Sequence, residues 1–268
     1  MKKNQKLNNK PHERPIGRGL TLSRIWDEGT TVYIIGGGPS IAYSAGIMDP
    51  VLKGVEGSGR RVRPDYDKIK KISEYLAPIH NQRVIGVNNS YMLGNWVDVV
   101  WFGDCGWFNF HQQKMSDEYF GLRCSCCPRF GDNPKHGVYF FARDNERKVG
   151  ISTKPNRVAW NHNSGSSAIN VAYHLGATRI VLLGFDMKNA QLQENKSRID
   201  THWHGGHKAT MVQISDDTLK KHLEGFPYIA KQAPHLGLEI INAVYPPLGS
   251  GITSFRKVSI DNVLKGTF

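Results

Sequence analysis

Residues 31–40 read TVYIIGGGPS, a β-branched and aromatic run that ends directly in three glycines, a proline and a serine. Valine, isoleucine and tyrosine favour strands, whereas glycine and proline interrupt them. The stretch therefore predicts a strand from Thr31 to Ile35 and a tight turn at Gly36–Ser40. Because glycines let a backbone turn sharply and approach a ligand closely, the turn is also a candidate binding loop.

Similar patterns follow along the chain. Apolar residues share one helical face at 65–76, 165–175 and 216–232, and Ser164 is the expected N-cap of the second of these helices. Further strands are predicted at 83–87, 97–102, 138–142, 179–184 and 238–244. Strands that alternate with helices predict an α/β fold with a Rossmann-like, mostly parallel sheet and helices on both faces.

The domain organisation follows from length and periodicity. Residues 1–20 lack hydrophobic periodicity and are expected to form a disordered basic tail. Residues 21–268 are long enough for a single nucleotide-binding and catalytic domain. The segment 105–156 is rich in cysteine and proline, so we expect an irregular insertion there.

The chain is strongly basic. It has 35 lysines and arginines against 23 aspartates and glutamates, a net charge of +12. A cluster between Lys53 and Lys71 contains Arg60, Arg61 and Arg63. Such clusters neutralise nucleic-acid phosphates, or they form solvated faces. The sequence contains no apolar run long enough to cross a bilayer and no secretory signal, so a cytoplasmic location is expected.

Four cysteines occur, at Cys105, Cys124, Cys126 and Cys127. Cytoplasmic cysteines stay reduced, so a disulfide is not expected. Together with His136 these thiols could bind zinc, although their spacing matches no standard zinc knuckle; plain thiols in a loop are the alternative.

Polar and glycine residues gather where the predicted strands end. Gly36–Ser40, the pair Asn88 and Asn89, Asp104 and Asp186 each follow a strand. In a parallel sheet, ligands bind outside the carboxyl ends of the strands. These residues are therefore expected to form one site.

Two of the segments have the character of anion sites. Gly36, Gly37, Gly38 and Ser40 can offer backbone N–H groups to a phosphate, or they simply form a turn. Ser164, Gly165 and Ser166 open a helix, where free N–H groups and hydroxyls bind an anion or a ribose; helix capping alone is the other interpretation.

Residues 201–208, THWHGGHK, form a histidine-rich loop. His202, His204 and His207 can ligate a metal, with Asp186 adding an oxygen, or one of them can act as a general base. The glycine pair at 205–206 suggests a lid that closes over the site.

The order of these motifs resembles a family of bacterial sialyltransferases with a Rossmann-like nucleotide-binding domain. More loosely, it resembles flagellin-modifying glycosyltransferases and pterin diphosphokinase-like domains. The matching blocks are the strand and glycine loop at 32–40, the asparagine after the second strand, the Ser-Gly helix through Gly-Phe-Asp at 164–186, and Gly206-His207.

The resemblance implies a cytidine-nucleotide-type donor, inverting transfer without a divalent metal or other cofactor, and His207 as the base. It places Gly38, Asn89, Ser164, Gly165 and Ser166 around the nucleotide. Lys188 stands where the family has a tyrosine on the donor phosphate, and Gly37 replaces the usual asparagine. A lysine can contact phosphate as a point charge.

Three functions follow as hypotheses. The first is a nucleotide-sugar-dependent glycosyltransferase, whose acceptor is a hydroxylated base in DNA or, alternatively, a glycan or a protein. The second is a pterin- or nucleoside-directed diphosphotransferase, which requires magnesium at Asp104 and Asp186. The third is a nucleotide- or DNA-binding protein without catalytic activity.

Overall fold

The computed structural model describes residues 22, 24–27, 29–48, 52–56, 61–131, 136–188, 202–204 and 215–268. The proposed basic tail at 1–20 and His207 lie outside the described residues. No helix in the described ranges is long and apolar enough to cross a membrane.

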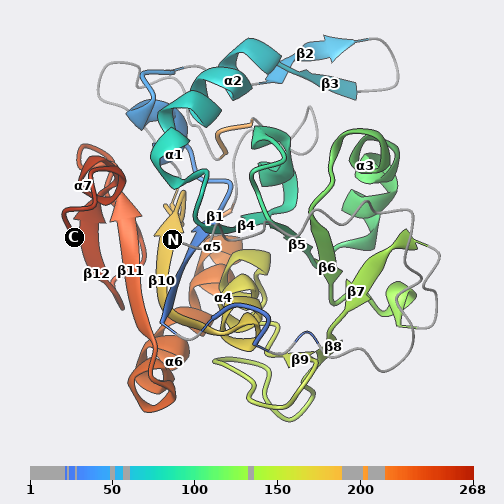
Figure 1. The fold of residues 1–268 in the computed structure, drawn as a ribbon, viewed down its shortest axis with the longest axis vertical. Coiled ribbons are helices and arrows are strands. Elements are labelled where there is room, and N and C mark those ends of the chain that lie inside the picture. Colours follow the sequence, from blue (N-terminus) through green and yellow to red (C-terminus); the bar gives the residue numbers. More distant parts are fainter. Residues whose placement is uncertain are drawn as a thin grey trace.

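The fold is built on one sheet of eight strands (Figure 1). Its order is β12-β11-β10-β1-β4-β5-β6-β7, and every neighbouring pair is parallel. The strands are β1 (Thr30–Ile35), β4 (Arg83–Val87), β5 (Val99–Phe102), β6 (Leu122–Ser125), β7 (Val138–Phe140), β10 (Ala177–Leu183), β11 (Glu239–Val244) and β12 (Arg256–Ser259). The predicted α/β class with a parallel sheet is confirmed.

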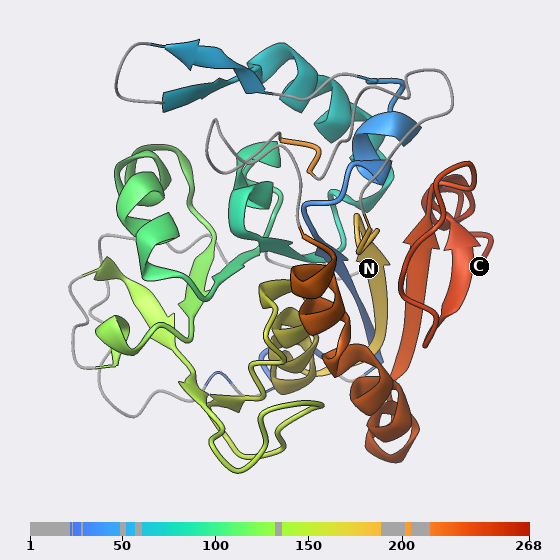
Figure 2. The same ribbon diagram turned by 180° about the vertical axis from the view of Figure 1, so that it is seen from behind.

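Helices cover both faces of this sheet. One core cluster combines residues of α1, α2, α3 and α7, and the other combines residues of α4 and α6. Figure 2 shows α4, α5 and α6 in front of the sheet. The helices are α1 (Ser40–Ser44), α2 (Tyr66–Tyr75), α3 (Cys105–Glu118), α4 (Ser164–Leu175), α5 (Asp216–Leu223), α6 (Gly225–Gln232) and α7 (Ile260–Leu264), with short 3-10 turns η1 (Ala77–Ile79), η2 (Asn88–Leu93), η3 (Pro128–Phe130) and η5 (Ala233–Leu236).

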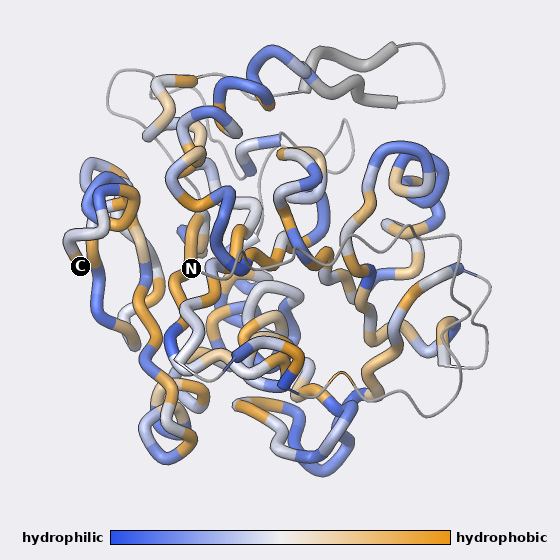
Figure 3. The backbone as a smooth tube through the Cα atoms, viewed as in Figure 1, coloured by the Kyte–Doolittle hydropathy of each residue, from blue (hydrophilic) through white to orange (hydrophobic). Residues whose placement is uncertain are grey.

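The central strand β1 shows why its sequence is apolar without alternation. Val32 and Ile34 point into the cluster beneath α4, whereas Tyr33 and Ile35 point into the cluster beneath α1 and α2. A strand buried on both faces needs apolar residues at every position. Hydrophobic colours accordingly concentrate on the central strands in Figure 3.

The strand order reverses next to β1. From β1 the chain adds β4, β5, β6 and β7 on one side, then returns to place β10, β11 and β12 on the other. At such a reversal the loops that leave the two neighbouring strands, here β1 and β10, run to opposite faces of the sheet. Open parallel sheets bind ligands in the crevice between these loops.

Two pairs of short strands lie outside the main sheet. The antiparallel hairpin of β2 (Leu52–Glu56) and β3 (Arg61–Pro64) accompanies α2 beyond the carboxyl edge of the sheet (Figure 1). The pair β8 (Ala142–Arg143) and β9 (Arg157–Val158) precedes α4.

The segment 105–156 is more regular than expected. It contributes the 14-residue helix α3 and the sheet strands β6 and β7, and its irregular part begins after β7. The four-residue strand β6 is too short to show a period in the sequence, which explains why the pattern missed it. Strand β7 was predicted at 138–142 and ends two residues earlier than expected. The predicted helix at 216–232 is two helices, which meet at Glu224 and Gly225.

The expectation that the cysteines are reduced is wrong for two of them. Cys105 and Cys127 form a disulfide with a Cα–Cα distance of 5.9 Å, while Cys124 and Cys126 are free and buried. The parallel neighbours β5 and β6 end side by side and bring the pair together. The bond closes a loop of 22 residues, which stabilises the fold by about 3 kcal/mol in the chain-entropy model.

The disulfide also removes the zinc site considered for this segment. Two of the proposed thiol ligands are bonded to each other. The ring of His136 packs edge-on against Phe108 and Phe130.

Candidate functional site

The loops that leave β1 and β10 are joined at the carboxyl edge of the sheet. The backbone N–H of Ser40 donates to Oδ2 of Asp186 over 2.8 Å, which links residues 146 positions apart. Ser90, in the turn that follows β4, adds a hydrogen bond from Oγ to the carbonyl of Gly36, 3.3 Å away. The structure therefore brings together the glycine turn, the turn after β4 and Asp186.

The glycine turn lies directly against the end of β10 and the loop that follows it. The N–H groups of Gly36 and Gly38 donate to the carbonyls of Leu183 and Gly184 at 2.7 and 2.8 Å. A Cβ on Gly36 would lie 2.7 Å from the Gly184 oxygen, and one on Gly38 would lie 2.5 Å from Oδ2 of Asp186. The N–H groups of Gly36 and Gly38 are thus occupied by protein carbonyls, and the neighbouring Gly37 is half-buried.

Asp186 is a buried carboxyl group at the end of β10. It is 2% exposed, and its Oδ1 has no hydrogen-bond partner among the described residues. Burial raises its pKa to about 6, against the opposing effects of the Ser40 N–H and the Lys188 ammonium. The group therefore changes charge at a higher pH than an ordinary aspartate, and a carboxyl shifted in this way is a candidate site residue.

Replacing Asp186 by asparagine is expected to stabilise the protein at alkaline pH. The folded-state pKa of about 6 exceeds the ordinary 3.8, so the folded protein holds this proton more tightly than the unfolded chain. The resulting stabilisation is fully present below pH 3.8 and is lost as pH rises through about 6. Above pH 7 the variant should gain up to about 3 kcal/mol over the wild type.

Urea unfolding of both proteins at pH 4.5 and pH 8 measures this effect. The advantage of the variant should grow between the two conditions. A difference in the free energy of unfolding that is the same at both pH values would show that Asp186 does not titrate in this range.

Lys188 lies on the same loop, two residues beyond Asp186. Its ammonium group donates to the carbonyl of Leu248 in the loop before β12. It is half-buried and lowers the pKa of Asp186 through its charge. A cation held at this edge is suited to an anionic ligand.

The two asparagines after β4 have different surroundings. Asn88 has a φ of 51°, in the left-handed region, and its buried Oδ1 makes no hydrogen bond within the described ranges. Asn89 is 4% exposed; its Oδ1 accepts from Nε1 of Trp107 at 2.6 Å, and its Nδ2 lies 3.3 Å from Nδ1 of His204. Asn89 therefore connects α3 to the histidine segment.

The start of α4 is capped by Asn163, not by Ser164 as predicted. Asn163 has an extended backbone, and its Oδ1 accepts from the N–H groups of Gly165 and Ser166 at 2.6 and 3.4 Å. The Ser166 hydroxyl donates to the carbonyl of Asn163. Asparagine and serine are both favoured N-cap residues, and Asn163 lies one position before Ser164. The extended backbone of Asn163 makes it the residue that caps the helix. Of the three proposed contacts here, half-buried Ser164 is the most accessible.

Asp104, the strand-end residue after β5, has a different role from the strand-end residues described above. It is exposed and caps α3 by accepting from the N–H of Gly106 at 2.7 Å. It follows β5, which is separated from β10 by β1 and β4, so β5 and β10 are three strand spacings, about 14 Å, apart. The strands that precede Asp104 and Asp186 are therefore not neighbours, and among the described residues neither carboxylate belongs to a group of three or more histidines, cysteines or carboxylates that could hold a metal ion.

The histidine segment is anchored by Trp203, a residue of the loop 201–208 to which the sequence pattern assigned no role. Trp203 is 1% exposed and packs in the same core cluster as Tyr33 and Ile35. Its backbone N–H donates to the Gly37 carbonyl at 2.7 Å, and its indole Nε1 donates to the Gly36 carbonyl at 2.9 Å. The segment 202–204 is thereby fixed to the glycine turn.

The histidines on either side of Trp203 lie against that turn. A Cβ on Gly37 would approach Cδ2 of His202 to 2.7 Å and Nε2 of His204 to 3.3 Å. The two imidazole rings are 5.0 Å apart. Within the part of the chain that the structure describes, no group of three or more histidines, cysteines or carboxylates is placed to hold a metal ion.

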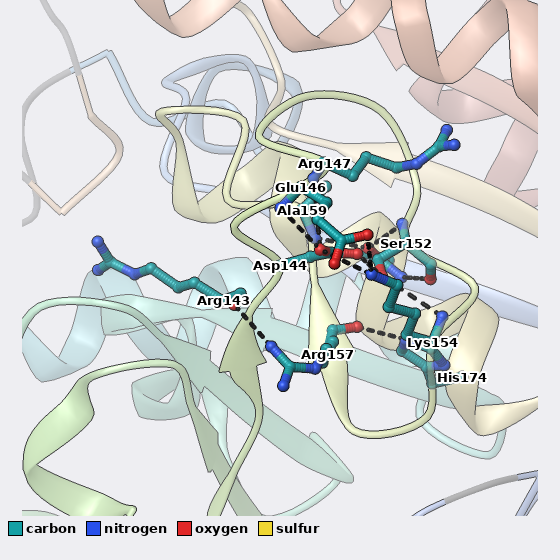
Figure 4. Close-up of polar contacts among 10 residues, drawn as sticks. Arg143, Asp144, Glu146, Arg147, Ser152, Lys154, Arg157, Ala159 and His174 are labelled. Carbon is teal, nitrogen blue, oxygen red and sulfur yellow. Dashed lines mark hydrogen bonds and ion pairs between the residues drawn. The ribbon is translucent and has the colours of Figure 1, made fainter.

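A second polar cluster surrounds β8 and β9 (Figure 4). Asp144 accepts from the Ser152 hydroxyl at 2.6 Å and from the N–H groups of Glu146 and Arg147. Burial raises its pKa, but these hydrogen bonds and the Lys154 charge outweigh that effect, and the net pKa is lowered. Both carboxylate oxygens of Asp144 accept hydrogen bonds, which hold the loop between β8 and β9 in place. Asp186 differs, because only its Oδ2 has a hydrogen-bond partner among the described residues.

Comparison with known proteins gives a distant likeness. No family model matches the chain, and no curated protein matches it. Among solved structures it is similar to the sialyltransferase CstII from Campylobacter jejuni in complex with a substrate analogue, cytidine-5'-monophosphate. The identity is 13%, the match covers 85% of this chain and 89% of the other, and the TM-score is 0.40. At this distance the likeness does not assign the chain to a family.

Proposed function

We propose that the chain is a glycosyltransferase that moves a sugar from a nucleotide-activated donor to an acceptor hydroxyl. The observation that carries the proposal is the reversal of strand order between β1 and β10, beside which lie the glycine turn, Asn89 and the anchored histidine segment. Parallel sheets bind nucleotides at such a point.

The chemistry of sugar transfer fits the groups gathered there. An inverting displacement needs no enzyme nucleophile, only a base for the acceptor hydroxyl and groups that stabilise the departing phosphate. Lys188, the Gly37 backbone and Ser164 at the start of α4 are proposed for the phosphate, with Gly38, Gly165 and Ser166 shaping the nucleotide site. His207 is proposed as the base, and a divalent metal is not required.

A nucleotide panel in a thermal-shift assay tests the donor. Cytidine or uridine nucleotides should raise Tm without a divalent metal, since a ligand at 100 times its Kd adds about 2.7 kcal/mol. Lys188→Met should weaken this stabilisation, whereas the matched Lys154→Met, which removes a lysine from the β8–β9 cluster, should leave it unchanged. Binding of ATP only with magnesium would favour a diphosphotransferase, and a response to DNA alone would favour a non-catalytic binding protein.

The acceptor is proposed to be a hydroxylated base in nucleic acid, with a glycan or a protein as the alternative. The net charge is +12, and the β2–β3 hairpin, whose register sets Lys53 opposite Arg63, stands beyond the carboxyl edge that holds the site. Positive charge near a binding edge attracts a polyanion.

Salt dependence tests this acceptor. Affinity for DNA should fall steeply with salt, and changing Arg60, Arg61 and Arg63 to glutamine should reduce the slope of log K against log salt by about three. Deleting residues 1–18 separates an effect of the tail from one of the hairpin. Full activity on a neutral acceptor, independent of salt, would discard nucleic acid while leaving the transferase proposal in place.

A further inference from the structure

Three buried side chains form a hydrogen-bonded row beside the glycine turn. Trp107 comes from α3, Asn89 from η2 and His204 from the histidine segment, and they are 8%, 4% and 1% exposed. Nε1 of Trp107 donates to Oδ1 of Asn89 at 2.6 Å, and Nδ2 of Asn89 lies 3.3 Å from Nδ1 of His204.

The direction of this row is fixed by the donor at its Trp107 end. An indole N–H can only donate, so the Asn89 atom that faces Trp107 must be the oxygen. The other Asn89 atom is then the amide nitrogen, which also can only donate. Nδ1 of His204 must therefore accept, and the single proton of the neutral imidazole must be on Nε2. Protonating Nδ1 as well would set two donors against each other.

The protonated nitrogen lies on the side of the glycine turn. Nε2 of His204 is 3.3 Å from the position that a Cβ would take on Gly37, and the neighbouring Trp203 N–H holds the Gly37 carbonyl. Only a glycine leaves room there, so His204 and the Gly37 backbone face each other closely.

We propose that Trp107 and Asn89 hold His204 as the neutral Nε2–H tautomer, which makes His204 a hydrogen-bond donor to a phosphate oxygen of a nucleotide bound at Gly37. The tautomer follows from the hydrogen bonds alone, whereas the ligand rests on the proposed function. In this tautomer the nitrogen facing the turn has no free lone pair. His204 therefore binds the donor, and the general base is a different histidine.

The tautomer is read by nitrogen-15 NMR of the full chain with labelled histidine, His204 being assigned by comparison with His204→Phe. At pH 7.5 without ligand, Nδ1 should be unprotonated and Nε2 protonated. In Asn89→Asp a carboxylate oxygen replaces the amide donor, so the proton should move to Nδ1. Trp101→Phe is the matched control, because it removes a buried indole N–H that donates to Ser167 instead. It should leave the His204 signals unchanged.

Binding of cytidine 5′-monophosphate tests the ligand. His204→Phe and Asn89→Asp should each weaken it at least about tenfold, as expected for loss of a hydrogen bond to a charged group, and Trp101→Phe should not. A proton on Nδ1 in the wild type would overturn the tautomer, a result that does not depend on Asn89→Asp folding correctly. Undiminished binding by His204→Phe would overturn the donor role. An Nε2–H tautomer in a wild type that binds no nucleotide would overturn the proposed function and the ligand, but not the tautomer.

Discussion

Replacing His207 by alanine is expected to lower kcat by about 10²–10⁴-fold while the affinity for the nucleotide-sugar donor is retained. A general base acts on the acceptor hydroxyl in the transition state and contributes this much to the rate. The donor contacts proposed above lie on other residues, so KM for the donor should change little. Steady-state kinetics with the donor identified in the thermal-shift panel measures both constants.

His202→Ala, assayed beside it with and without EDTA, is the control. His202 lies against Gly37, so its loss should affect donor binding more than kcat. A metal site makes a different prediction, because His202, His204 and His207 would all be required and a chelator would abolish activity that zinc or manganese restores. Full turnover by His207→Ala would reject the base assignment.

Trp203→Ala is expected to reduce the free energy of unfolding by about 3–5 kcal/mol. The indole is 1% exposed in the core cluster beneath α1 and α2, so alanine leaves a large cavity. The change also removes the indole hydrogen bond to the Gly36 carbonyl. Urea unfolding measures the loss, and transferase activity should fall with it because the histidine segment is no longer fixed to the glycine turn.

Trp203→Phe separates packing from hydrogen bonding. Phenylalanine keeps most of the apolar contact but loses the Nε1 donor, so it should cost about 1–3 kcal/mol, the range for leaving a buried carbonyl unpaired. If Trp203→Ala unfolded at the wild-type urea concentration, the segment 202–204 would not be anchored in the core.

Local sequence patterns predicted the central strands well because each is a continuous apolar run closed by glycine or asparagine. Arg83–Val87 has the bounds expected, and Thr30–Ile35 begins one residue earlier than expected. Helix α2 likewise lies within one residue of its predicted bounds at both ends, and the Asp65 side chain caps it by accepting from the Lys68 N–H. Where an element was short, as in β6, or polar, as in α3, the pattern carried too little signal.

The sequence by itself determined the parallel α/β class and the positions of the glycine turn, Asn89, Asp186 and the histidine segment along the chain. Only the tertiary structure decided the strand order, the Cys105–Cys127 bond, the separation of Asp104 from Asp186, and the row from Trp107 through Asn89 to His204. The physical reason is the distance along the sequence over which each kind of interaction acts. Strand and turn propensities act within a few residues, whereas these features depend on contacts between side chains 18 to 115 positions apart, which exist only once the sheet has assembled.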